Sequence, residues 1–149
     1  RANERKAEPA GQVGLARHAR GERGFDPDRV IRGVQDELFP LAKNYYRTEA
    51  GLTDSLAKLE QLWGELRETP KLESVREVER ARTAASLLAA ARWSYRSGLR
   101  RRETRGLNRR ADHPTLDPKQ THYQVTGGLD RIWIRDQPVR GASAGEART

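Results

Sequence analysis

The densest group of charged side chains lies between residues 96 and 110. Seven arginines stand there against one glutamate, Glu103, which gives a local charge of +6. Guanidinium groups bind carboxylates and phosphates through paired hydrogen bonds, so this cluster could do three kinds of chemistry. It could form a solvated helix end with local ion pairs, such as Glu103 with Arg100 or Arg101; it could dock against another domain or subunit; or it could bind nucleic acid. The arginines are Arg96, Arg100, Arg101, Arg102, Arg105, Arg109 and Arg110.

No other group of residues has the spacing of a catalytic or metal site. The chain has no cysteine, no G-x-G-x-x-G, no G-x-x-x-x-G-K-[ST] and no G-x-S-x-G motif. Its three histidines, His18, His113 and His122, lack the i, i+4 spacing of a helical metal site. Asp112 and His113 are neighbours in sequence, so we expect their side chains to point apart. We therefore assign no catalytic, cofactor-binding or metal-ligating residue.

The composition predicts one modest, highly solvated domain. Of the 149 residues 35% are apolar and 34% are charged, and the mean hydropathy is -0.94. No apolar run approaches the roughly 20 residues of a membrane span, and the lack of cysteine fits the cytosol. The net charge of +8 is concentrated in the arginine cluster and in residues 1–24. The lack of methionine indicates a fragment of a longer chain.

The elements that must position the arginine cluster are predicted to be helices. Asp26-Pro27-Asp28 is typical of a helix start. Pro40 should kink or split the first helix, whose apolar face is Val30, Val34, Leu38, Leu41 and Tyr45. A turn at residues 47–51 leads into a second helix, which ends at Thr69-Pro70 and has the face Leu52, Leu56, Leu59, Trp63 and Leu66. A third helix is predicted from Leu72 to about Arg102, with the face Val75, Val78, Ala81, Ala85, Leu88, Ala91 or Arg92, and Tyr95.

Three amphipathic helices with short turns predict a mainly α fold, an antiparallel three-helix bundle of the spectrin-repeat type. Residues 121–126 and 131–135 read as two strands on either side of a turn at Gly127-Gly128, which predicts a C-terminal β-hairpin. We expect Trp63 in the core, and Trp93 on a second contact surface because it lies one residue off the third helix's stripe. The predicted organisation is a flexible basic linker at 1–24, the bundle at 25–106, an extended segment with the hairpin at 107–140 and a loose tail at 141–149.

Residues 102–114, hereafter the signature segment, resemble the E-S-R-G-A-H-Y-R-x-D-Y-P motif near the carboxyl end of one flavoprotein family. The family comprises the flavoprotein subunits of succinate dehydrogenase and fumarate reductase, and L-aspartate oxidase. The residues that agree are Glu103, Arg105, Gly106, Arg110, Asp112 and Pro114. The departures are Thr104 for serine, Leu107 for a small residue, Asn108 for histidine, and Arg109 and His113 for aromatic residues. A looser similarity extends over about residues 26–139.

The resemblance implies a non-catalytic C-terminal helical domain of an FAD-dependent oxidoreductase, not expected to be active alone. It places FAD in a preceding flavin-binding domain of the parent protein, on which this domain packs. It implies an iron–sulfur or other electron-transfer subunit as a further partner, and a cytoplasmic location, peripheral at the membrane through partner subunits. The implied domain-docking residues are Glu103, Arg105, Arg110 and Asp112. Two alternatives are a basic helical module that binds nucleic acid, which the scarcity of aromatic side chains disfavours, and a stand-alone adaptor that recruits an acidic protein through the Trp93 face and the arginine cluster.

Overall fold

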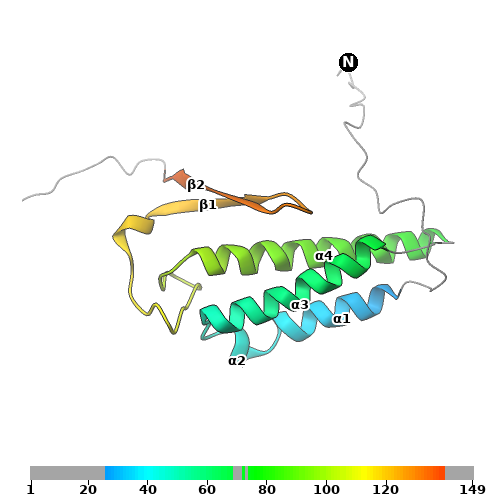
Figure 1. Cartoon of the computed structure of the whole chain (residues 1–149), viewed down its shortest axis with the longest axis horizontal. Coiled ribbons are helices and arrows are strands. Elements are labelled where there is room, and N and C mark those ends of the chain that lie inside the picture. The colour runs from blue at the N-terminus through cyan, green and yellow to red at the C-terminus, as the bar shows by residue number, and fades with distance from the viewer. Residues whose placement is uncertain (1–25, 69–71, 73, 140–149) are drawn as a thin grey trace, which may run out of the picture.

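The computed structural model describes residues 26–68, 72 and 74–139 and shows a helical bundle with a hairpin beside it (Figure 1). Among the three long helices, α1 (Pro27–Leu38), α3 (Glu49–Glu68) and α4 (Val75–Arg100), α3 runs antiparallel to the other two (Figure 1). The short helix α2 (Leu41–Asn44) joins α1 to α3. A 3₁₀ turn (Pro118–Gln120) precedes strands β1 (His122–Gly127) and β2 (Trp133–Pro138). The predicted mainly α fold, a helical bundle followed by a hairpin, is confirmed; the predicted linker and tail lie outside the described residues.

Side chains at their first turns explain where α1 and α4 begin. The Asp26 carboxylate accepts hydrogen bonds from the N–H groups of Asp28 and Arg29, which have no partner within the helix. At α4 the Ser74 hydroxyl accepts from the Glu77 N–H, and the Glu77 carboxylate accepts from the Ser74 N–H. The third helix was predicted over 72–102 and is observed two to three residues shorter at each end.

Pro40 splits the first predicted helix in two, as its missing N–H and its ring require. Helix α1 ends at Leu38, and α2 begins directly after the proline. The prediction that Leu41 and Tyr45 share the buried face of α1 was wrong, because α2 has its own axis. Leu41 is 73% exposed and Tyr45 is 41% exposed.

The core lies between α1, α3 and α4. The predicted apolar face of α3 is buried throughout, and Leu59 is 0% exposed. Helix α4 faces it largely with small side chains such as Ala84 and Ala91, which let the helices approach closely. Val75 was predicted on the buried face of α4 but is 77% exposed. Helix α4 is longer than both neighbours, so its first turn extends past them.

The hairpin lies along α4 (Figure 1) and pairs antiparallel from His122↔Pro138 to Gly127↔Trp133. Its strands are shifted by one to three residues from the predicted ranges. Gly128 has a φ of 85°, and a Cβ there would lie 2.1 Å from the Arg131 carbonyl oxygen, so the turn requires glycine. The Trp93 indole N–H donates to the Gly128 carbonyl oxygen at 2.6 Å. The second surface that Trp93 contacts is therefore the turn of the hairpin.

Within the described part of the chain, we find no helix that is both long enough and apolar enough to cross a lipid bilayer.

Replacing Leu59 with alanine should lower the free energy of unfolding by about 3 kcal/mol, because the side chain is fully buried between the helices. Urea unfolding followed by circular dichroism at 222 nm measures this loss. The matched control is Leu107→Ala, at a side chain that is 95% exposed, where the change should stay within about 0.5 kcal/mol. Equal losses in the two variants would contradict the assignment of the core.

Candidate functional site

The signature segment leaves the end of α4 and returns along the start of α3. It contains a tight turn in which the backbone N–H groups of Arg105 and Asn108 each donate to the other residue's carbonyl oxygen, both at 3.0 Å. Gly106 takes a φ of 57° in this turn, a conformation that glycine adopts without strain. Leu107, at the tip, is 95% exposed. The turn therefore presents an apolar side chain to the surroundings.

Arg110 caps the carboxyl end of α4. Its side chain is 1% exposed, and Nη1 donates to the carbonyl oxygens of Gly98 at 2.8 Å and Arg101 at 3.2 Å. The last carbonyl groups of a helix have no partner within it and carry partial negative charge. The buried Arg110 guanidinium donates hydrogen bonds to these carbonyl groups and also offsets their partial negative charge.

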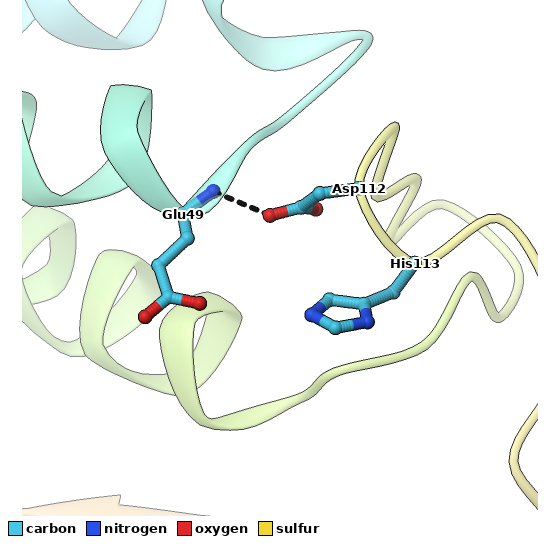
Figure 2. A group of neighbouring side chains, drawn as sticks. All are labelled: Glu49, Asp112 and His113. Carbon is cyan, nitrogen blue, oxygen red and sulfur yellow. Dashed lines mark hydrogen bonds between the residues drawn. The ribbon is translucent and has the colours of Figure 1, made fainter.

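Asp112 connects Arg110 to the amino end of α3. Its two oxygens accept from Arg110 Nε and Nη2, each at 2.8 Å, and Oδ2 also accepts from the Glu49 N–H at 2.7 Å (Figure 2). Glu49 is the first residue of α3, so the carboxylate lies at the positive end of that helix. The Arg110 hydrogen bonds, helped by the Glu49 N–H, hold the pKa of Asp112 far below its usual range.

Further hydrogen bonds join the segment to Arg47, just before α3, and hold the segment's own backbone. The Arg47 N–H donates to the Arg109 carbonyl oxygen at 3.1 Å, and the Ala111 N–H donates to the Arg47 carbonyl oxygen at 2.8 Å. The Thr104 hydroxyl accepts from the Arg110 N–H and donates to the His113 carbonyl oxygen, both at 2.9 Å. Threonine thus supplies the hydroxyl at a position where the family motif has serine.

Glu103 is buried inside the segment and organises its turns. Its carboxylate accepts from Arg101 Nη1 and Arg105 Nε, each at 2.7 Å, and from the Asp117 N–H at 2.9 Å. Arg105 lowers the pKa of Glu103 to about 2 despite its burial, and Asp117 and Arg101 contribute. The expected pairing with Arg101 is confirmed, whereas the alternative partner Arg100 binds Asp136 instead at 2.6 Å. The picture of a solvated Glu103 pair is wrong, since the backbone folds around this carboxylate, which is 0% exposed.

The whole arginine cluster is used within the fold. Six of its seven arginines form ion pairs with carboxylates of this chain, and the seventh, Arg109, lies over the Tyr45 ring at 4.7 Å from its centroid. Among the predicted docking residues, Glu103 and Arg110 point inward, whereas the Arg105 and Asp112 side chains are 39% and 29% exposed. The four form two ion pairs, Glu103 with Arg105 and Arg110 with Asp112; their docking role stays a prediction.

One group of side chains has the composition of a cation site. Ligand atoms of Glu49, Asp112 and His113 lie within 4.8 Å of one another (Figure 2). The expectation that Asp112 and His113 point apart was wrong, because the chain turns here, with the His113 N–H donating to the Arg110 carbonyl oxygen at 3.1 Å. Both Asp112 oxygens already accept hydrogen bonds from Arg110, and the Glu49 carboxylate forms an ion pair with Arg102. Two guanidinium groups so close disfavour a cation, and we assign no metal.

The described residues do not fit the flavin that the resemblance implies for the parent. A dinucleotide's pyrophosphate is commonly bound at a free helix N-terminus. The first turns of α1, α3 and α4 already donate to Asp26, Asp112 and Ser74. Two of these acceptors are carboxylates, which repel a phosphate group.

Arg92, which the sequence placed as an alternative to Ala91 on the apolar face of the third helix, is a second buried arginine, and its partners were not predicted. Its side chain is 2% exposed, lies over the Trp63 ring, binds Glu60 and donates to the Leu129 carbonyl oxygen at 2.8 Å. It therefore ties the hairpin to the bundle. The signal was present, since residue 92 falls on the apolar stripe of α4, where a charged side chain needs a buried partner.

Arg110→Lys should lower the free energy of unfolding by about 3 kcal/mol, because lysine cannot bind Asp112 with two hydrogen bonds and also reach the α4 carbonyls. Urea unfolding monitored by tryptophan fluorescence measures the loss. Arg109→Lys keeps a cation near Tyr45 and should change stability by no more than about 0.5 kcal/mol. A small effect at residue 110 would show that the cap is not needed.

Acid should weaken the segment. The lowered pKa of Glu103 means that its contribution is complete above about pH 4.5 and is lost as the pH falls toward about 2. Glu103→Gln should therefore be less stable than the unsubstituted chain by about 2 kcal/mol at pH 6. This difference should shrink as the pH falls through that window. Urea unfolding of both proteins across the range tests it; parallel stability curves would contradict it.

Comparison with known proteins agrees with the resemblance that the signature segment suggested. No curated protein and no solved structure matches the chain. The family model described as the fumarate reductase flavoprotein C-terminus matches residues 42–139, about two thirds of the 149 residues. The matched region includes α3, α4, the Arg110–Asp112 connection and the hairpin. The chain therefore belongs to the succinate dehydrogenase/fumarate reductase flavoprotein C-terminal family.

Proposed function

We propose that this chain is a non-catalytic C-terminal domain that packs on the flavin-binding domain of an FAD-dependent oxidoreductase of the succinate dehydrogenase/fumarate reductase type. The observation that carries the proposal is the connection between buried Arg110 and partly exposed Asp112. It holds the exposed turn at residues 105–108 at one end of the bundle, and its own charged atoms are hydrogen-bonded to the ends of α4 and α3. Such an arrangement suits a surface that positions another domain.

The four predicted docking residues divide this work between them. Glu103 and Arg110 act from inside, fixing the backbone of the turn, whereas Arg105 and Asp112 keep part of their side chains accessible. Helix α2 and the connection after α4 lie at the same end of the bundle (Figure 1), and several apolar side chains on or beside these two segments are exposed. Exposed apolar groups of this size are typical of interaction surfaces. They are Leu107 at 95%, Phe39 and Leu41 at 73%, and Tyr46 at 62% exposed.

The electrostatics support a structural role over a catalytic one. A general acid or base works best with a pKa near the operating pH. The pKa values of Glu103 and Asp112 are instead held well below their usual range by neighbouring guanidinium groups. We propose that hydride transfer between FAD and a small carboxylate-bearing substrate takes place in the parent's other domains. An iron–sulfur or other electron-transfer subunit is the further partner, and the assembly is cytoplasmic or peripheral at the membrane.

Leu107→Ser in the full-length parent should speed the release of flavin about tenfold, because docking would bury one leucine side chain fewer. Arg105→Ala should act in the same direction by loosening the turn around Glu103. Flavin release is followed by its fluorescence after dilution. The control is Leu87→Ser, at an exposed position in the middle of α4, which should have no effect.

Unchanged flavin release and unchanged thermal stability in both variants would contradict the docking proposal. Leu107→Ser should also leave the stability of the separate 149-residue chain within about 0.5 kcal/mol, since the side chain makes few contacts there. A large loss in the separate chain would instead show that Leu107 acts within the domain.

A further inference from the structure

A hollow of about 510 Å³ lies between the bundle and the hairpin. Its apolar lining comes from three elements: Leu56 of α3, Leu99 of α4, Ile134 of β2 and Ile132, which directly precedes β2. Leu99, Ile132 and Ile134 are half-buried, whereas Leu56 belongs to the core and is 9% exposed. The hollow is therefore an apolar groove that is open to the surroundings.

Arginines form the charged rim of this groove. Arg96 and Arg100 come from the last turns of α4, and Arg102 follows that helix. Their side chains are 44%, 45% and 62% exposed. Glu49 is the one acidic residue among the described residues that line the hollow, and the other two carboxylates that pair with these arginines, Glu60 and Asp136, lie outside the lining.

The ion pairs that these arginines make are easily exchanged. Arg96 pairs with Glu60, Arg100 with Asp136 and Arg102 with Glu49, and every one of these carboxylates is at least 30% exposed. Exposed ion pairs contribute little to stability because water screens both charges. A carboxylate that arrives with apolar side chains beside it can therefore share or replace these partners at small cost.

We propose that this groove binds an acidic segment of a partner protein, in which carboxylates alternate with aliphatic side chains. The aliphatic side chains occupy the floor formed by Leu56, Leu99 and Ile132, and the carboxylates meet the guanidinium groups of the rim. Charge complementarity selects the partner, and arginine forks bind carboxylates with two hydrogen bonds.

The lining favours an acidic peptide over a nucleic acid. Single-stranded nucleic acids bind basic grooves through bases stacked on aromatic rings. The described residues that line this groove include no aromatic side chain. An aliphatic floor instead allows leucine-like side chains of a peptide to bury their apolar surface.

This inference goes beyond the docking of the flavin-binding domain. None of the four docking residues lines the groove, and Leu107 does not line it either. The partner is a separate protein, so loss of peptide binding and loss of flavin retention are independent results.

The test measures binding of a fluorescein-labelled peptide of alternating glutamate and leucine to the full 149-residue chain by fluorescence anisotropy at low salt. We expect saturable binding that weakens as salt is added. Arg102→Glu should weaken it about fivefold, because an attractive charge becomes repulsive. Ile132→Ser should weaken it about threefold by removing part of the floor.

The matched control is Arg82→Glu, which makes the same charge change on α4, about 21 Å from Arg96 along the helix axis. Its affinity, compared at about 0.1 M salt, should stay within about twofold of that of the unsubstituted chain, since the Debye length is then about 10 Å. Circular dichroism confirms that each variant is folded.

Four outcomes would overturn the proposal. One is the absence of saturable binding up to about 1 mM peptide. A second is an equal loss in Arg102→Glu and Arg82→Glu, which would indicate attraction to the overall charge. A third is equal affinity for a peptide with serine in place of leucine, which would show that the floor is unused. The fourth is tighter binding of a single-stranded oligonucleotide with the same sensitivity to Arg102→Glu, which would make the groove a nucleic-acid surface.

Discussion

The pairing of Arg110 with Asp112 is the interaction on which this domain's architecture depends. The guanidinium satisfies the last carbonyl groups of α4, and the carboxylate satisfies the first N–H of α3. Adjacent antiparallel helices present opposite partial charges at the same end of a bundle. One buried ion pair can therefore complement both helix ends, provided that the chain between its two members is short. Here a single residue separates them.

The same arrangement explains why so many arginines are compatible with a small helical fold. A local charge of +6 would oppose compaction if the side chains faced one another in a low-dielectric interior. Instead, carboxylates from α3, the signature segment and β2 lie among them as Glu60, Glu103 and Asp136. The basic cluster is thus a structural device, and Arg96, Arg100 and Arg102 line the groove between bundle and hairpin while paired with carboxylates of the chain.

Much of the fold could be predicted because it rests on local rules. Four features depend on residues only a few positions apart. They are the start of α1 at Asp26-Pro27, the break at Pro40, the buried stripe from Leu52 to Leu66 and the glycine turn of the hairpin. The candidate site was predictable only as a set of residue types. One of the open alternatives put Glu103 in a solvated ion pair, and Asp112 was expected to point away from His113, since neither the turn around Glu103 nor the bend before His113 has a periodic pattern.

By itself the sequence determined the helical bundle with its hairpin, the stripe that forms the core and the family to which the chain belongs. The tertiary structure alone decided the partners: Arg110 caps one helix, Asp112 caps another, and Arg92 holds the hairpin through Leu129. The physical reason is range. Helix and turn preferences act over a few neighbouring residues, whereas a buried charge must find its counterpart wherever folding brings a carboxylate or a free backbone group close.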